Sequence, residues 1–202
     1  MSAFLGPIHY WLWNKIKVQD EMVKTIIDFA KETLGSTSLQ EEIEGAYGTL
    51  EQGALEENIN EGNIHGWLQQ RVTLVERSLA KAVKTLLDKN KVEFATLETL
   101  FYEEGKKRKL PETFGVKEAF KHLEDMLLDG MPCDRANEII EETDEKVVWK
   151  RNHCVHKQYW DEVGEDISYY YRLREAFIKG MVEGTKIVFR KIDESTNELG
   201  IS

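Results

Sequence analysis

The sequence predicts a mainly α-helical protein: a four-helix bundle made of two repeated helix hairpins, followed by a small α+β C-terminal part with an antiparallel β-hairpin. Long stretches have apolar residues at helical spacing, and the 202 residues include only three prolines. A short motif that starts a helix occurs twice. The segment 137–152 instead combines β-branched residues with a central turn. We therefore expect a bundle domain over 1–105 and a second domain over 106–202.

The repeated motif is Gly-x-Ile-His-x-Trp-Leu. It occurs at Gly6–Leu12 and again at Gly62–Leu68. Trp and His are rare residue types, so the repetition indicates a duplicated supersecondary unit. In an up-down-up-down bundle the first and third helices are parallel, which places His9 and His65 at the same end.

The first hairpin is predicted over 8–34 and 38–58. Pro7 fits the first helical turn, where its missing N–H is not needed. Gly35 fits the end of the first helix. The second helix should be kinked or short, because each glycine inside a helix costs up to about 1 kcal/mol relative to alanine; these glycines are Gly45, Gly48 and Gly53.

The second hairpin has a long helix from Asn63 that ends at Asp88-Lys89-Asn90, and a shorter helix over 92–104. A fifth helix is predicted over 111–128, beginning at Pro111. Two further helices are expected at 156–163 and 167–182.

The β-hairpin is predicted to pair 137–142 with 146–152 around the turn Thr143-Asp144-Glu145. This register places Ile139 opposite Trp149 and Ile140 opposite Val148, which are favourable cross-strand pairs. Residues 186–192 alternate as a third strand would, and the tail from Glu194 is expected to fray.

Composition limits the partners. The net charge is −10, from 37 acidic against 27 basic residues, so a nucleic acid backbone would be repelled. The N-terminus lacks the pattern of a secretory signal, and no apolar run would span a bilayer. Two cysteines do not make a disulfide framework. We expect a cytoplasmic protein that uses neither nucleic acid nor membrane as a partner, and homo-oligomerisation is left open.

The two motif histidines are the first candidate site. A bis-histidine site at one end of the bundle would bind a transition metal, zinc or iron, or a haem. Trp11 and Trp67 would then contact the ligand. The alternative is that His9 and His65 are core residues that bond to a carbonyl and stack on those indoles.

The second candidate is the segment His153–His156. In an extended strand Cys154 and His156 face the same side, where they could hold a metal or act as a catalytic thiol and base. A buried structural thiol is the alternative. The hairpin register brings Cys133 and Asp134 near Cys154.

We expect these groups to form one pocket, in which the Cys154–His156 segment closes the His9 and His65 end. Metal ligands would be His9, His65, Cys154 and His156. The residues expected to contact a ligand are Trp11, Trp67, Cys133, Asp134 and Tyr170.

The C-terminal third also resembles a known family. The hairpin Glu138–Glu142, its return Val147–Trp149, Cys154, the turn Tyr159–Gly164 and the helix Arg174–Gly180 are similar to the L-2-amino-thiazoline-4-carboxylic acid hydrolase-like family, of the 4-vinyl reductase domain type.

This resemblance implies a ligand pocket between helices and a small sheet, and ring-opening hydrolysis of a small cyclic amidine-like substrate. Only Cys154 matches a catalytic position, and Arg172 and Arg174 stand where acidic residues are expected. The sequence thus predicts a metal- or metallocofactor-binding protein that acts on a small molecule, with hydrolysis as one reaction. The alternative is a non-enzymatic sensor or carrier of haem, metal or a small ligand.

Overall fold

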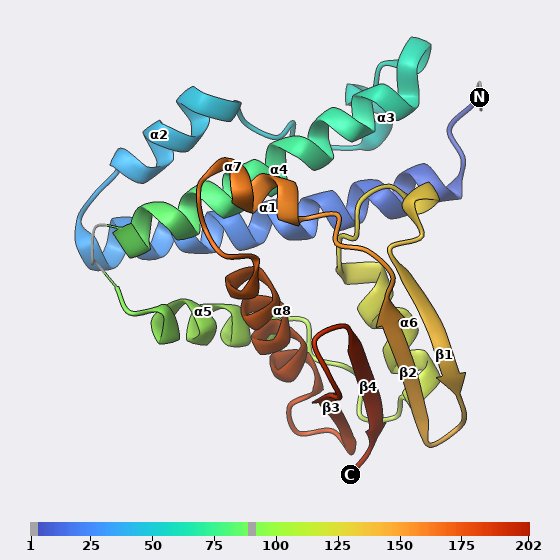
Figure 1. Ribbon diagram of the computed structural model, residues 1–202. Coiled ribbons are helices and arrows are strands. Elements are labelled where there is room, and N and C mark those ends of the chain that lie inside the picture. The colour runs from blue at the N-terminus through green and yellow to red at the C-terminus, as the bar shows by residue number, and fades with distance from the viewer. Residues whose placement is uncertain (1–3, 89–91) are drawn as a thin grey trace.

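The computed structural model describes residues 4–88 and 92–202. Two long helices, α1 (Pro7–Leu34) and α4 (Ile64–Asp88), lie side by side in the upper half of Figure 1. The imidazoles of His9 and His65 meet near the N-terminal ends of both helices. The two helices are therefore parallel, as expected from the repeated motif. Lys89 and Asn90, at the expected end of the second long helix, lie outside the described residues.

The segment 38–58 is not one continuous helix, and the expectation of a short or kinked helix is confirmed. The segment is divided into α2 (Ser38–Tyr47) and α3 (Leu55–Asn58). Gly48 and Gly53 between them have φ angles of 83° and 97°, values that interrupt a right-handed helix and that glycine adopts at little steric cost. α2 packs on α4 and α1.

The second shorter helix, α5 (Phe94–Lys106), packs most extensively against α8 (Ile167–Val182). The two backbones touch at a pair of glycines. A Cβ atom added to Gly105 would lie 2.0 Å from the carbonyl oxygen of Phe177, and one added to Gly180 would lie 2.0 Å from that of Tyr102. α5, which we expected in the N-terminal bundle, thus packs mainly on a helix of the C-terminal part.

The helix predicted over 111–128 is shorter, because α6 spans Val116–Met126. Pro111 begins a turn, in which the Phe114 N–H donates to the Pro111 carbonyl. The helix starts after Gly115, whose N–H donates to the Glu118 carboxylate at 2.7 Å. The remaining predicted helix is α7 (Lys157–Glu162), which packs on α4. Single 3₁₀ turns occur at η1 (Glu61–Asn63) and η2 (Pro132–Asp134).

The predicted hairpin is present as β1 (Asn137–Glu142) and β2 (Lys146–Arg151). Ile139 lies opposite Trp149, as expected. The expected pairing of Ile140 with Val148 is wrong, because Glu141 takes that place. The extra residue forms a β-bulge, which bends the edge strand.

The C-terminal tail is a strand and does not fray. β4 (Thr196–Ile201) lies between β2 and β3 (Ile187–Lys191), so the antiparallel sheet has the order β1-β2-β4-β3. Asn, Glu and Gly in this tail have low strand propensity. Pairing on both sides outweighs that local preference. The strand state of the tail therefore depends on its two neighbours and not on its own residues.

The main core draws on both halves of the chain. It contains apolar residues of α1, α4, α5, α6, α8 and the sheet, with Ile26, Leu97, Phe177 and Leu199 fully buried. A second, smaller core lies at the N-terminal ends of α1 and α4. The mainly helical class with an α+β C-terminal part is confirmed. Within 4–88 and 92–202 no helix combines the length and the apolarity needed to cross a membrane.

Candidate functional site

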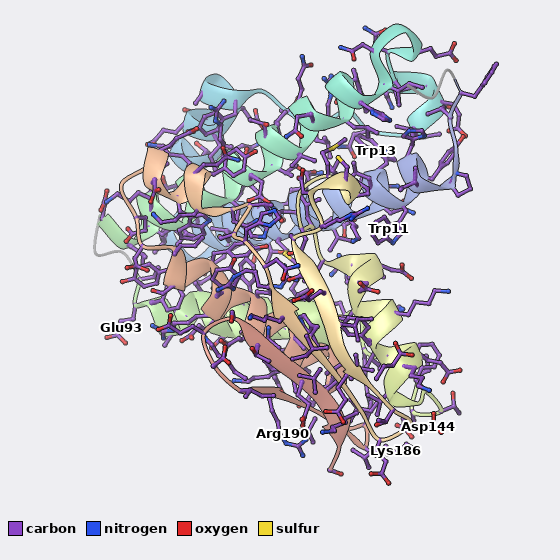
Figure 2. All side chains as sticks on the ribbon, turned by 45° about the vertical axis from the view of Figure 1, so that its right-hand side comes forward. Trp11, Trp13, Glu93, Asp144, Lys186 and Arg190 are labelled. Carbon is purple, nitrogen blue, oxygen red and sulfur yellow. The ribbon has the colours of Figure 1, made fainter. Side chains whose placement is uncertain are left out.

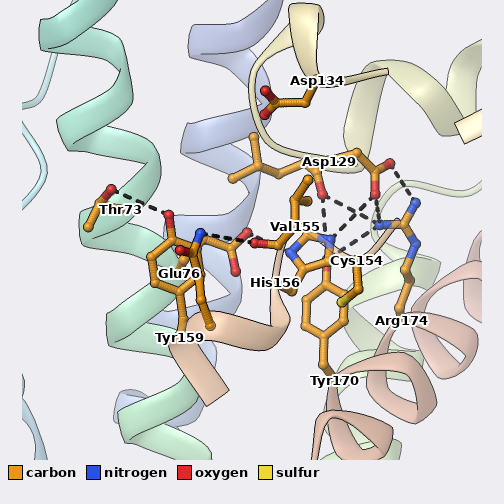
Figure 3. Close-up of polar contacts among 12 residues, drawn as sticks. Thr73, Glu76, Asp129, Asp134, Cys154, Val155, His156, Tyr159, Tyr170 and Arg174 are labelled. Atoms are coloured by element: carbon orange, nitrogen blue, oxygen red, sulfur yellow. Dashed lines mark hydrogen bonds and ion pairs between the residues drawn. The ribbon is translucent and has the colours of Figure 1, made fainter. Parts of the chain in front are cut away.

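A buried ionic network joins α4, the loop after α6 and α8 (Figure 3). His156 is only 1% exposed. Its Nδ1 lies 2.9 Å from Glu76 Oε1, and its Nε2 lies 3.4 Å from Asp129 Oδ1. Arg174 donates to both carboxylate oxygens of Asp129, at 2.8 and 2.7 Å. The ring of Tyr170 stacks on His156, with centroids 4.0 Å apart.

The network is held in its charged form. Burial alone would lower the pKa of His156, but Glu76 and Asp129 outweigh it and raise that pKa to about 9. Burial alone would likewise raise the pKa of Asp129, but Arg174 and His156 hold it well below its usual range. An imidazolium between two carboxylates is a cross-link of the fold, and both of its nitrogens are engaged. His156 therefore has no lone pair available for the predicted metal or base role in this state.

The two cysteines have different surroundings. The Tyr171 hydroxyl donates to Cys154 Sγ at 3.0 Å, and Cys154 is partly buried. Cys133 is an exposed free thiol. Asp134 accepts the Met131 N–H at 2.8 Å and so closes the η2 turn. Asp134 thus stabilises a turn, and Cys154 has a packing role.

The motif histidines meet directly. His9 Nε2 and His65 Nε2 are 3.3 Å apart. The Gly6 N–H donates to His9 Nδ1 at 2.9 Å, so the proton of a neutral His9 lies on Nε2 and faces His65. A histidine that binds metal usually donates through its other nitrogen, and here that nitrogen accepts. The pair is thus arranged as a hydrogen bond that also closes the start of α1.

The expected joint pocket is wrong. His156 contacts Glu76, which follows His65 by three turns of α4, or about 16 Å at 1.5 Å per residue. The segment after β2 docks on the middle of α4 because α7 packs there, through the Arg77–Glu162 ion pair. Within the described ranges, no three or more His, Cys, Asp or Glu side chains are grouped to hold a metal ion.

A cavity of about 150 Å³ lies next to this network, bounded by α1, α6, the loop 129–137, β2 and α8. Its apolar walls include the rings of Trp11, Phe120 and Trp149. Trp11, which was predicted to contact a ligand, lines this cavity. Trp11 lies between α1 and α6 in Figure 2, where its indole N–H donates to Asp125 Oδ1 at 2.7 Å. The other predicted indole, Trp67, packs against Trp13 in the smaller core.

Lys15 is the polar group that distinguishes the cavity. Its side chain lines the cavity and is 6% exposed, with Nζ 3.4 Å from the centre of the Trp11 ring. In the part of the chain that the structure describes, no carboxylate lies within ion-pair distance of this amine. Burial lowers the pKa of Lys15 to about 8, which Asp129 opposes and Arg174 favours.

Two further charged groups line the cavity. Glu124 exposes much of its side chain, yet burial at the wall raises the pKa of its carboxyl. Arg135 has φ 50°, a left-handed conformation that no other non-glycine residue adopts within 4–88 and 92–202. Such strained residues cluster at functional sites.

Sequence reasoning missed Lys15, Glu124, Arg135 and the network partners of His156. Lys15 had a signal, because it follows Leu12 by three positions and precedes Gln19 by four, on the inward stripe of α1. The other groups come together only through the loop 129–137, whose path no local pattern determines.

No family model, curated protein or solved structure matches this chain.

Proposed function

We propose that the protein binds a small carboxylate in the cavity lined by Lys15. The observation that carries this proposal is the buried ammonium of Lys15, which has no carboxylate partner among residues 4–88 and 92–202. A buried charge without a partner is costly, so such groups are retained where a ligand supplies the missing charge. At pH 7 an amine with a pKa of about 8 is mostly protonated and attracts an anion.

The neighbouring cations have unequal roles. Arg174 is neutralised by its two bonds to Asp129. Arg135, at the exposed side of the cavity, is available to guide an anion inward. Lys15 then contributes the buried end of the site, and Arg135 its entrance.

The size and walls limit the ligand. A cavity of about 150 Å³ is the size of one that holds a benzene ring in another protein. The indoles of Trp11 and Trp149 present flat apolar surfaces. The ligand is therefore a carboxylate with about six to ten non-hydrogen atoms and a short or planar apolar part.

Small-ligand binding is common to both functions expected from the sequence, a carrier or sensor and a hydrolase. Ring opening, which the family resemblance implies, would use this same cavity and adds catalysis to binding. We place the protein in the cytoplasm, in keeping with its few cysteines.

Calorimetric titration of the full chain with L-lactate, pyruvate and benzoate tests the proposal. At least one of these carboxylates should bind, and Lys15→Met should weaken its binding about 10- to 100-fold, the value of a charge-assisted hydrogen bond. Lys24→Met is the matched control, because Lys24 is an exposed lysine on the same helix that pairs with Asp20 and does not line the cavity. Equal binding of lactamide, which lacks the charge, or unchanged affinity in Lys15→Met would overturn the proposal.

A further inference from the structure

Lys15 and Glu124 line one cavity, and neither takes part in a hydrogen bond or ion pair among the described residues. Lys15 is buried and Glu124 is exposed at the rim, whereas the buried charged groups elsewhere in the described residues have partners, as Glu104 has in Lys107 and Arg108, and His156 in Glu76. An amine that contacts only an indole and a carboxyl without an ion-pair partner, both lining one open cavity, are groups that carbonyl chemistry can use.

We propose that Lys15 forms an imine with a small 2-oxo acid held in the cavity. The inference rests on the proposed carboxylate binding and adds a covalent step to it. Charged Lys15 and Arg135 would attract the carboxylate together. Once Lys15 loses its proton, Arg135 would hold the carboxylate, and the indoles of Trp11 and Trp149 would flank the carbonyl carbon beside Nζ.

The amine is suited to this step. With a pKa of about 8, roughly 10% of Lys15 is neutral at pH 7, against roughly 0.03% for a lysine at 10.5. Only the neutral amine is nucleophilic, so burial raises the reactive fraction about 300-fold.

The reaction balances without a further reactant. The Nζ lone pair forms a bond to the carbonyl carbon, the C=O π electrons move to oxygen, and a nitrogen proton transfers to give a carbinolamine. The Glu124 carboxyl protonates the hydroxyl, which leaves as water while nitrogen forms the C=N bond. The nitrogen proton that remains can return to Glu124.

Reductive trapping of the full chain tests the proposal. The protein is incubated with pyruvate and sodium cyanoborohydride, which reduces an imine to a stable amine, and is then analysed by intact mass and peptide mapping. One reduced pyruvate per chain is expected on Lys15. Acetaldehyde, which has a carbonyl but no carboxylate, should label Lys15 at least ten-fold more slowly.

Variants separate binding from covalent chemistry. Lys15→Arg keeps the cation, so L-lactate should still bind, but the adduct should be lost. Lys24→Arg should be labelled on Lys15 as the parent is. Glu124→Gln should slow trapping about 100-fold, the usual contribution of a general acid.

The outcomes distinguish the two proposals. Lactate and pyruvate binding with no adduct, or an adduct spread over surface lysines, would refute the imine and leave carboxylate binding intact. No binding of any carboxylate would refute the proposed function as well. An adduct in Lys15→Arg at the parental rate would show that another lysine reacts.

Discussion

At the residue scale, Lys15 shows what a sequence pattern conveys and what it omits. Its position on the inward stripe of α1 was readable, but lysines at such positions commonly extend their amines to water. Here the side chain ends over the Trp11 ring instead. The loop that brings Asp129 and Arg135 to this amine is far away in the sequence, so its charge environment could not be read from α1.

The burial of Lys15 has a cost that can be measured. Its pKa is about 8 in the folded chain and 10.5 when exposed, so the charged form destabilises the fold by about 3 kcal/mol. The penalty is fully present below about pH 8. Between pH 8 and 10.5 only the unfolded chain still binds this proton, so the stability of the fold rises with pH and the penalty disappears. The charges that set this value are Asp129, Arg174, Glu124 and Asp125.

We therefore expect Lys15→Met to be more stable than the parent at pH 7, by up to about 3 kcal/mol in urea unfolding. The stability difference should shrink between pH 8 and 10.5. Comparing the variant with its parent removes the contribution of His156, which both proteins share. A difference of zero at pH 7, or one that grows with pH, would contradict the assigned environment of this amine.

At the element scale, the sequence predicted most helices and the hairpin. Apolar spacing and glycines located α1 and α4, and β-branched residues on both sides of a turn located β1 and β2. The contact of α5 with α8 was not predictable, because a glycine that permits close approach has the same local pattern as one that ends a helix. The helix predicted over 92–104 stops before Gly105, but Gly105 lies within α5.

Gly105→Ala should destabilise the protein by about 1–3 kcal/mol or more, because the new Cβ would overlap the Phe177 carbonyl oxygen. Gly45→Ala is the matched control. Gly45 lies inside α2 with nothing within 4 Å of an added Cβ, so the change should raise stability by up to about 1 kcal/mol. Thermal unfolding of both variants measures the contrast. Equal effects would mean that the α5–α8 contact is looser than described.

At the scale of the whole molecule, the fold class was predictable and the site was only partly so. Trp11, predicted to contact a ligand beside His9, lines a different cavity between α1 and α6. The joint pocket of His9, His65 and His156 failed because docking of the C-terminal part depends on α7 and on the loop 129–137. Each supplies long-range contacts that carry no periodic signal. The β4 tail failed for the same reason, because its strand state comes from its two neighbours.

The position of β4 makes the end of the chain part of the core. Leu199 is fully buried, whereas Ile201 in the same strand is 41% exposed. Leu199→Ala should cost about 2–5 kcal/mol and Ile201→Ala much less, as measured by urea unfolding. A mild effect at Leu199 would show that the last strand is dispensable to the sheet.

The cavity walls also give the protein an optical signal. Of its five tryptophans, Trp11 and Trp149 line the cavity, while Trp13, Trp67 and Trp160 pack in the two cores away from it. A molecule that enters the cavity contacts these two indoles and leaves the other three unchanged. Occupancy should thus shift the tryptophan emission spectrum of the unlabelled chain, so that candidate ligands can be screened by fluorescence alone.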